Sequence, residues 1–417
     1  MKRLLLILIT FICAGYSQAQ VDTLRIATYN LLNFPDATSN SRIPHFITVI
    51  DAIDPDILVV QELTEAIGVT TFLNDVMNHN SNAYQAAPFL NGFDTDNGLF
   101  YKSAKILLLG SQNITTALRA ITEYVLSSNE VQFSIYSLHL KASQGAENEN
   151  KRLAEATILR TKLNLLLSTS NFIVAGDFNI YTASEPAYNL LTATGSQADN
   201  NGRLYDPINQ FGNWHINSSF RSIHSQSTRI TAFGDGAGGG LDDRFDIMLV
   251  SNSVLSGGGM DILPATYRAF GNDGNHFDQA ISAGSNSAVS ANVANALHQA
   301  SDHLPVFADF KVGTPTSVST LFDGPAAFEL SQNYPNPFNG ETVILFSVPV
   351  QSDIVLAIYD LAGRLVREWV ADNFSSGNHQ IQWDGRNDTG KLVGSGVYFY
   401  RLVGTDFTQT KKMILVY

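Results

Sequence analysis

The sequence predicts a layered α/β domain followed by a small β-sandwich, and two observations lead to this prediction. Strand-like and helix-like segments alternate from Leu24 to about Lys311, which is the order expected of sheets covered by helices. Beyond residue 313 the segments are short, strand-like and separated by turn residues, as in a small all-β domain. A chain of 417 residues is long enough to form both.

Several runs in the first part have the apolar or alternating pattern of strands. They lie at residues 24–28, 56–60, 98–101, 132–140, 172–175, 245–250 and 306–310. Residues 149–167 have helical spacing, with one apolar side formed by Leu153, Ala156, Leu159, Leu163 and Leu166. Two glycine-rich stretches, 236–240 and 257–300, are expected to be loops. The longer one is expected to be functional or mobile because loops of that length are uncommon inside domains.

Polar side chains stand where most of these predicted strands end. They are Asn30, Glu62, His139, Asp177, Asn179, Asp302 and His303. Taken singly, each has an ordinary explanation, such as a turn at Asp177, a hydrogen-bonded structural role for His139 or a helix cap at Glu62. Taken together, they predict a ligand site, because layered α/β proteins bind ligands where strand ends converge.

The residue types in this set indicate a metal-dependent hydrolase. Carboxylate and amide oxygens are the ligands that Mg²⁺ or Ca²⁺ prefer, and Mn²⁺ accepts them as well. Imidazoles paired with carboxylates can act as general acids and bases. Hydrolysis of a phosphodiester needs an activated water, stabilised phosphoryl oxygens and a protonated leaving group.

The charge of the chain supports a bound cation. The formal net charge is −13, and removal of Lys2 and Arg3 with the first 19 residues would make it −15 (−13 − 2). Such a protein does not attract phosphates over long distances. A phosphodiester substrate therefore requires a cation in the site. Hydrophobic residues at 44% and charged residues at 15% argue against disorder.

The N-terminus has the three parts of a secretory signal peptide, residues 1–19. Met1-Lys2-Arg3 is basic, residues 4–14 are apolar, and Ser17-Gln18-Ala19 supplies small residues for cleavage after Ala19. The apolar run is too short to span a bilayer, and the alternative is a buried first helix. Cys13 is the only cysteine, so the mature chain would have neither disulfides nor cysteine metal sites.

Six motifs occur in the order found in one enzyme superfamily. They are Arg25-Ile-Ala-Thr-Tyr-Asn30, Asp54-Pro-Asp-Ile-Leu-Val-Val-Gln61-Glu62, Ser137-Leu-His139, Gly176-Asp177-Phe-Asn179, Arg244-Phe-Asp246 and Ser301-Asp302-His303-Leu-Pro305. The chain resembles the endonuclease/exonuclease/phosphatase superfamily, which includes DNase I-like nucleases, sphingomyelinases and inositol polyphosphate phosphatases. The resemblance implies, for residues 20–312, a four-layer α/β sandwich of two sheets flanked by helices, with the site at one edge.

The same resemblance implies roles for the motif residues. Glu62 would be the principal ligand of Mg²⁺ (or Mn²⁺ or Ca²⁺), with Asn30 beside it and Asp302 as a second carboxylate. Asp246 would orient His303, which activates water or binds the phosphate. The resemblance further implies that Asp177 and Asn179 position the nucleophile and a phosphoryl oxygen, and that His139 protonates the leaving group or binds phosphate. Which histidine is acid and which is base stays open.

Other charged residues are candidates for supporting roles. Substrate contacts are expected from Lys141, Arg152, Arg221 and Arg229. The alternatives are solvated surface charges for the first two, and ion pairs with Asp206, Asp242 or Asp243 for the last two. Asp94 or Asp96 is expected to be the carboxylate partner of His139.

The C-terminal part differs in kind from the first. Residues 313–325 read as a linker. Residues 326–417, with Asn333-Tyr-Pro-Asn-Pro-Phe-Asn339 at the start and Lys411-Lys412-Met-Ile-Leu-Val-Tyr417 at the end, resemble the type A sorting domain of the bacterial type IX secretion machinery. That resemblance implies an immunoglobulin-like sandwich, a Bacteroidetes-type cell and export through the outer membrane. The alternative is a carbohydrate- or surface-binding sandwich.

These observations predict a secreted or cell-surface, monomeric, divalent-metal-dependent phosphodiesterase without a membrane span. We expect a nuclease acting on DNA or RNA. One alternative is a phosphatase or phospholipase-like esterase with another substrate, because loops such as 257–300 would set the specificity. Another is a non-catalytic surface protein with a degenerate hydrolase fold. Endo or exo action and the preferred metal stay open.

Overall fold

The computed structural model describes residues 21–192, 201–232, 234, 236–313, 328–333, 336–348, 352–374, 377–404 and 407–417. The predicted signal peptide, Cys13 and nearly all of the predicted linker lie outside these residues, so those assignments stay predictions. Within the described ranges, no helix combines the length and the apolar character needed to cross a membrane.

Two β-sheets form the centre of the first domain. The six-stranded sheet has the order β10 (Met260–Ala269), β11 (Val306–Val312), β1 (Asp22–Phe34), β2 (Ile57–Leu63), β4 (Asp96–Lys102) and β3 (Tyr84–Ala86). The five-stranded sheet has the order β5 (Leu107–Ile114), β6 (Ile121–Ser128), β7 (Val131–His139), β8 (Phe172–Asp177) and β9 (Asp246–Val250). Only the pairs β1–β2 and β7–β8 are parallel within these sheets.

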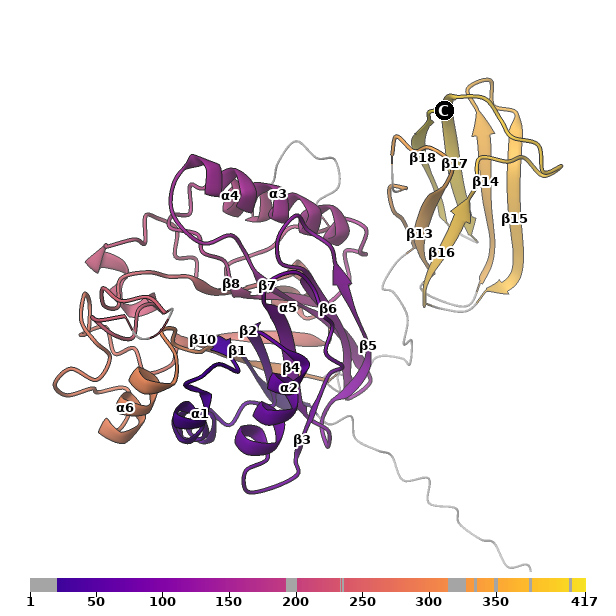
Figure 1. The fold of residues 1–417 in the computed structure, drawn as a ribbon. Helices are drawn as coiled ribbons and strands as arrows, with labels where there is room; N and C mark the ends of the chain where they lie inside the picture. The colour runs from indigo at the N-terminus through magenta and orange to yellow at the C-terminus, as the bar shows by residue number, and fades with distance from the viewer. Residues whose placement is uncertain are drawn as a thin grey trace, which may run out of the picture.

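Helices cover the outer face of each sheet (Figure 1). α1 (Ser39–Ile53), the π-helix η1 (Phe72–Met77) and α6 (Ala291–Ala300) pack against the six-stranded sheet in one apolar core. α3 (Ala146–Leu163) and α4 (Pro186–Thr192) pack against the five-stranded sheet in another. The shorter helical elements are α2 (Ala66–Thr71), the 3₁₀ helix η2 (Ser218–Ile223) and α5 (Asn252–Ser256).

A third core joins the inner faces of the two sheets and completes four layers. Strand periodicity explains how one strand serves two cores, because alternate side chains point to opposite faces. On β1, Leu24 and Ile26 enter the core between the sheets, whereas Ala27 and Tyr29 face the helices. The predicted four-layer α/β sandwich is therefore confirmed.

Strand register brings the predicted site residues to one edge. On the five-stranded sheet, His139 pairs with Asp177 and Asp177 pairs with Asp246. On the other sheet, Asn30 pairs with Gln61, which places Glu62 beside it. β8 approaches β7 so closely before Asp177 that a Cβ at Gly176 would lie 2.0 Å from the Leu138 carbonyl oxygen, at a φ of 146°. Only glycine fits there without rearrangement.

The predicted loop at residues 257–300 is wrong in part, because it contains β10 and α6. Met260 and Ile262 of β10 enter the core between the sheets, and Leu297 of α6 enters the core beneath α1. Ser290 caps α6 by accepting a hydrogen bond from the Val293 amide. The many Gly, Ser and Asn residues of this stretch obscured the pattern of the few apolar residues that enter the cores.

The C-terminal domain is a small β-sandwich, as predicted. One sheet has the order β12 (Glu329–Leu330), β13 (Thr342–Val348) and β16 (Gly377–Trp383). The other has the order β15 (Leu365–Phe374), β14 (Ser352–Asp360), β17 (Gly396–Gly404) and β18 (Phe407–Leu415). Trp383, Tyr400 and Met413 are among the buried residues of its core.

Candidate active site

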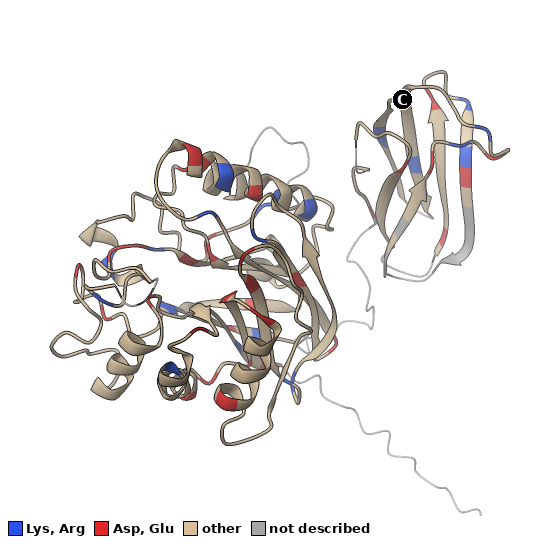
Figure 2. Ribbon diagram, in the orientation of Figure 1, with Lys and Arg blue, Asp and Glu red and all other residues tan. Residues whose placement is uncertain are grey.

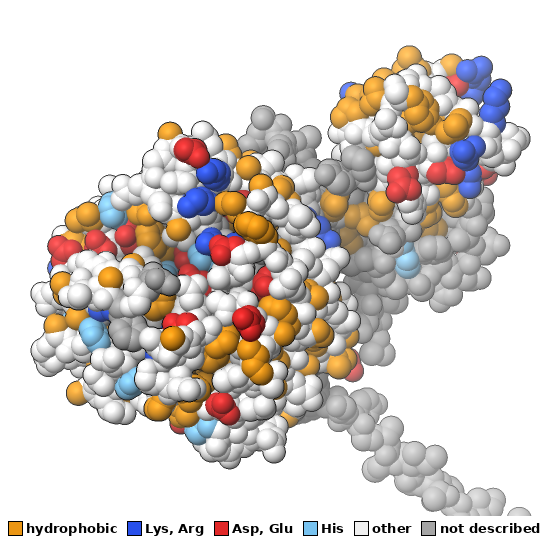
Figure 3. Space-filling view, viewed as in Figure 1, with side chains coloured by type: hydrophobic (Ala, Val, Ile, Leu, Met, Phe, Trp, Pro, Cys, Tyr) orange, Lys and Arg blue, Asp and Glu red, His pale blue; other side chains and the backbone are white. Residues whose placement is uncertain are grey.

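A cavity of about 540 Å³ opens where β2, β7 and β8 end. Its wall includes most of the predicted site residues, namely Glu62, His139, Asp177, Asn179, Asp302 and His303. Figure 2 shows Asp and Glu positions on and next to the central strands of this domain. On the face of the domain seen in Figure 3, Lys and Arg side chains are sparse. Four carboxylates, those of Glu62, Asp94, Asp177 and Asp302, line the cavity itself.

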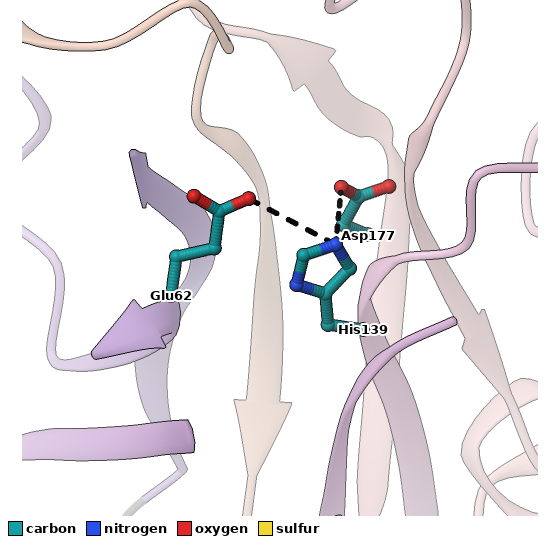
Figure 4. A group of neighbouring side chains, drawn as sticks. All are labelled: Glu62, His139 and Asp177. Carbon is teal, nitrogen blue, oxygen red and sulfur yellow. Dashed lines mark ion pairs between the residues drawn. The ribbon is translucent and has the colours of Figure 1, made fainter. Parts of the chain in front are cut away.

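Glu62, His139 and Asp177 form the centre of the site (Figure 4). Nε2 of His139 lies 3.4 Å from Oδ2 of Asp177 and 3.8 Å from Oε1 of Glu62. One ligand atom from each of the three residues lies within 4.8 Å of the others. Two carboxylates and an imidazole at such spacing can bind a divalent cation.

Asn30 lies beside Glu62, as predicted. Its Nδ2 donates to Glu62 Oε1 at 2.9 Å and to Asp177 Oδ2 at 3.2 Å, while its Oδ1 accepts from the Leu32 amide at 2.9 Å. The Leu32 N–H can only donate, which fixes this orientation of the amide. Asn30 thus bridges the two carboxylates through its nitrogen, and its role as a cation ligand stays a prediction.

Asp246 and His303 form a buried pair beside this group. His303 Nδ1 lies 2.7 Å from Asp246 Oδ2, and the Ser225 hydroxyl donates to the same oxygen at 2.7 Å. His303 Nε2 lies 2.6 Å from the Gln226 side-chain amide and 3.7 Å from Asp177 Oδ2. Asp246 therefore holds the ring so that Nε2 faces the cavity, as the resemblance implied.

Asp302 lines the cavity from the segment before β11. Its Oδ2 accepts from the Ala237 amide at 2.7 Å and from Gln226 Nε2 at 3.4 Å. The neighbouring Ser301 hydroxyl donates to the Asn30 carbonyl at 2.7 Å and ties this segment to β1. Burial raises the pKa of Glu62 and the charge of Asp302 raises it further, so the two carboxylates interact.

Burial and charge shift the pKa of every ionisable group at the centre. Burial raises the pKa of Glu62, and burial with the charges of Asp246 and Glu62 raises the pKa of Asp177 to about 7, against the opposing effect of His303. Burial lowers the pKa of His139 well below its usual value, and the charges of Arg119 and His303 lower it further. Burial alone would lower the pKa of His303, but Asp246, Asp302 and Asp177 raise it well above its usual value. Paired groups with opposite shifts are typical of acid–base sites.

The backbone around the cavity is unusual. Six of the residues that line it have left-handed φ angles without being glycine, namely Leu32, Asn33, Glu62, Asp94, Ser143 and Asn179. Such conformations are unfavourable for bulky side chains and cluster at functional sites. At Glu62 the φ angle is 63°, and the Asn33 amide donates to its Oε2 at 2.9 Å.

Two of the predicted substrate contacts are buried away from the cavity. Arg152 pairs with Glu185 at 2.9 Å and donates to the carbonyls of Lys141 and Ser143. Arg229 is also buried and donates to the Ser301 carbonyl at 2.9 Å. The two guanidiniums fix the loops that carry site residues, so the structure does not support the prediction that they touch substrate.

The other two predicted contacts lie outside the cavity wall. Lys141 follows β7, and its Nζ donates a hydrogen bond to the Ala142 carbonyl oxygen. Its positive charge adds to burial in lowering the pKa of His139. Arg221 is exposed on η2 and lines a separate polar pocket. The alternative prediction for Arg221 and Arg229 is an ion pair with Asp206, Asp242 or Asp243. The ion pairs of the described residues include none of these, and Asp206 pairs with Arg244 instead.

Arg119 is the basic residue of the cavity wall, and the sequence did not reveal it. Its guanidinium pairs with Asp94 at 3.1 Å and donates to the Leu140 carbonyl. This pairing replaces the predicted contact between Asp94 and His139, and Asp96 accepts from the Gly92 amide instead. Nδ1 of His139 has no hydrogen-bond partner among the described residues. Recognition of β6, which begins at Ile121, would have drawn attention to Arg119.

Two family profiles match parts of this chain. The profile described as "Endonuclease/Exonuclease/phosphatase family" matches residues 27–303, and the profile "FlgD Ig-like domain" matches residues 333–406. A search of curated proteins gives no match to the chain.

Solved structures with a similar fold include TDP2 of D. rerio complexed with single strand DNA product, at 14% identity and a TM-score of 0.48 over 69% of this chain and 98% of that one. An endonuclease/exonuclease/phosphatase family protein of Bacteroides thetaiotaomicron is 16% identical over 70% and 99% of the two chains, with a TM-score of 0.43. The human Nocturnin catalytic domain with bound sulfate anion is 18% identical over 70% and 98%, with a TM-score of 0.43.

Proposed function

We propose, since this chain belongs to the endonuclease/exonuclease/phosphatase family, that it is a divalent-metal-dependent phosphodiesterase acting on nucleic acid. The observation that carries the proposal is the cavity group of Glu62, His139 and Asp177 beside the buried Asp246–His303 pair. The family match supports phosphoester hydrolysis in general. The dependence on a metal, the nucleic-acid substrate and the export from the cell are proposals that go beyond the family match.

The residues present fit a divalent cation. Burial and mutual repulsion raise the pKa values of Glu62 and Asp177, so negative charge is crowded in a place with little water to stabilise it. Oxygen ligands suit both Mg²⁺ and Mn²⁺. Glu62, Asp177 and Asp302 would hold the cation, which, when bound, supplies positive charge to stabilise a phosphoryl group in the transition state.

The chain itself supplies the remaining chemistry. Against the effect of burial, Asp246, Asp302 and Asp177 raise the pKa of His303. Its Nε2 lies 2.6 Å from the Gln226 side-chain amide, so Nε2–H can donate to a phosphoryl oxygen once that amide turns aside. Asp177, as an ionised carboxylate beside the cation, can position the attacking water by accepting a hydrogen bond from it. Asn179 keeps Asp177 in position by donating its amide to Oδ1 at 3.0 Å. His139 is neutral because its pKa is lowered, and its Nε2–H is placed to hydrogen-bond the leaving oxygen.

Two features in and next to the wall support a nucleic-acid substrate. Arg119 lines the cavity, and a phosphate next to the scissile one can compete with the partly solvated Asp94 for its guanidinium. Phe93, the residue before Asp94 in the chain, is 71% exposed, so its ring can stack on a base. The formal charge of −13 favours weak, cation-mediated binding over sequence-specific recognition.

We also propose that the protein is exported through the type IX secretion machinery and is released or held at the cell surface. The support is the signal-like N-terminus together with the sorting-domain motifs, to which the Ig-like profile adds a compatible fold. Deletion of residues 326–417 should retain the protein inside the cell while leaving the first domain active. Secretion without these residues would contradict the proposal.

A substrate panel tests the enzymatic proposal. Plasmid DNA, RNA, bis-nitrophenyl phosphate, sphingomyelin and inositol phosphates are incubated with Mg²⁺ or Mn²⁺, and in parallel with EDTA. We expect metal-dependent cleavage of nucleic acid that Glu62→Gln abolishes. Preferred cleavage of sphingomyelin or inositol phosphates, with the same dependence on Glu62, would contradict the nucleic-acid substrate. It would still support metal-dependent hydrolysis of phosphoesters. Unchanged activity in EDTA or in Glu62→Gln would overturn the metal-dependent mechanism.

A further inference from the structure

A second group of metal-ligating side chains lies outside the cavity wall. His215, Asp242 and Asp243 each offer one ligand atom, and these atoms lie within 4.8 Å of one another. The group adjoins the active site through Tyr181, which lines the cavity and contacts the His215 ring edge-on at 5.1 Å. The catalytic proposal uses none of these three residues.

We propose that His215, Asp242 and Asp243 bind a second divalent cation, one that stabilises the loops around the active site. An imidazole nitrogen with two carboxylates suits Zn²⁺ or Mn²⁺. Ligand atoms lie about 2.0–2.2 Å from such ions in tetrahedral sites, so neighbouring ligand atoms are about 3.3–3.6 Å apart. The observed spacing needs only small side-chain movements to reach this arrangement.

The charges at the group favour a cation. Asp242 and Asp243 are neighbours, and Asp278 adds a third negative charge near Asp242. Neither Asp242 nor Asp243 pairs with a Lys or Arg of the described chain, and the adjacent Arg244 is held by both carboxylate oxygens of Asp206. Burial and repulsion raise the pKa of both carboxyls, that of Asp243 to about 6. A bound cation would remove this repulsion.

The hydrogen bonds of His215 suit a ligand. Nδ1 lies 2.8 Å from Asp243 Oδ1, and Nε2 lies 2.7 Å from the side-chain amide of Gln144. A histidine that binds metal through one nitrogen commonly has the other held by a hydrogen bond. When the cation takes Nδ1, the ring proton moves to Nε2, and the Gln144 amide turns to accept it through Oε1. The cation then replaces the proton between Nδ1 and Asp243.

The place of the group explains what the cation would do. The Asp243 carbonyl accepts from the amides of Ser225 and Gln226 at 2.7 and 3.1 Å. Those two residues contact Asp246 and His303 through their side chains. Gln144 belongs to the loop after β7, next to Ser143 of the cavity wall. A cation here would therefore tie the loop after β7 to the segment that positions the Asp246–His303 pair.

Calorimetric titration of the full-length protein with Zn²⁺ tests the proposal. The titration uses Glu62→Ala, which removes the central carboxylate of the cavity. Glu62→Ala weakens the cavity site, and the loss caused by Asp242→Asn then assigns binding to the second group. We expect Zn²⁺ to bind Glu62→Ala, and this binding to weaken at least about tenfold when Asp242→Asn is added. The matched control adds Asp261→Asn on β10 and should leave binding unchanged. Equal affinity of the Asp242→Asn and Asp261→Asn proteins, or no binding to Glu62→Ala, would overturn the proposal.

Thermal melting provides a second readout that needs no activity. Zn²⁺ should raise the Tm of Glu62→Ala and of its Asp261→Asn form, because a ligand that binds only the folded state stabilises it. At the same Zn²⁺ concentration it should raise the Tm of the Asp242→Asn form and of a His215→Gln form by less. Electron spin echo spectra of bound Mn²⁺ in Glu62→Ala should show coupling to a histidine nitrogen that His215→Gln removes. Persistence of that coupling in His215→Gln would place the ion elsewhere.

Discussion

Nδ1 of His303 lies 2.7 Å from Oδ2 of Asp246, and both side chains are almost completely buried. The carboxylate determines which ring nitrogen faces the cavity, and it raises the pKa of the imidazole together with Asp302 and Asp177. This pair thus combines an orienting contact with a charge that keeps His303 protonated.

Replacement of Asp246 by Asn should test both effects. The amide keeps the shape and can still accept from Ser225, but it leaves His303 without its carboxylate. We expect kcat on bis-nitrophenyl phosphate to fall by about 10²- to 10⁴-fold, and Tm to fall because the buried His303 loses its charged partner. A kcat within threefold of wild type would mean that the pair is not needed for the chemistry.

Metal affinity should depend on pH in a direction set by Asp177. Its pKa rises from 3.8 to about 7 on folding, so the proton and the cation compete for the same carboxylate. Between about pH 5 and pH 6.5, Mg²⁺ affinity should rise about tenfold per pH unit and then level off above pH 8. Calorimetric titration with Mg²⁺ across this range measures the slope. A flat profile would remove Asp177 from the cation site.

The same shift predicts how pH affects the stability of the metal-free protein. A carboxyl whose pKa is raised in the folded state contributes stability below about pH 4, and this contribution is lost as pH rises through about 7. The Tm difference between Mg²⁺-saturated and EDTA-treated protein should therefore grow from pH 5 to pH 8. Scanning calorimetry of both forms checks this, and a difference that shrinks with rising pH would contradict it.

Asn30→Asp should distinguish a bridging amide from a metal ligand. The side-chain nitrogen of Asn30 donates to Glu62 and Asp177. The substitution therefore removes two hydrogen bonds and adds a negative charge. We expect unfolding in EDTA at pH 8 to become easier by about 1–3 kcal/mol. Urea denaturation monitored by circular dichroism measures the change. If Asn30 were instead an oxygen ligand, Asp would preserve or tighten Mg²⁺ binding without this loss.

Arg152 and Arg119 should respond differently to replacement by alanine. Arg152→Ala leaves Glu185 buried and uncompensated, which should cost about 3–5 kcal/mol of unfolding free energy. Arg119→Ala should raise KM for nucleic acid several-fold and leave Tm nearly unchanged, because the Arg119–Asp94 pair is partly solvated. Melting curves and steady-state kinetics on both variants check the contrast. A raised KM with unchanged stability in Arg152→Ala would indicate instead that Arg152 contacts the substrate.

Local patterns were sufficient to predict much of the site. Glu62, His139 and Asp177 each stand at or near the end of an apolar or alternating run, and such runs can be recognised without the rest of the chain. In the first domain, strands β3, β5, β6 and β10 were not predicted. Exposed or mixed residues interrupt their patterns, as the alternately exposed residues of β5 illustrate. Arg119 was missed with β6, and Ser225 and Gln226 lie in a segment without strand or helix periodicity.

The partners of charged and amide side chains could not be predicted in the same way. Arg152 and Arg229 have the residue type of a phosphate ligand, yet each is directed at loop carbonyls. The oxygen of Asn30 is fixed by the Leu32 amide, only two residues away, but its nitrogen meets Asp177, 147 residues further on. A side chain with several donors can serve either use, and only its neighbours decide between them.

The sequence by itself determined the layered α/β class, the small C-terminal β-sandwich and the chemistry of the acidic and imidazole side chains, because periodicity and residue type are properties of short segments. Only the tertiary structure decided which of these groups meet. Strand register sets His139, Asp177 and Asp246 side by side, and the packing of the two sheets brings Glu62 to them. Burial at that meeting point then shifts the pKa values of the groups, since desolvation depends on everything that surrounds a charge.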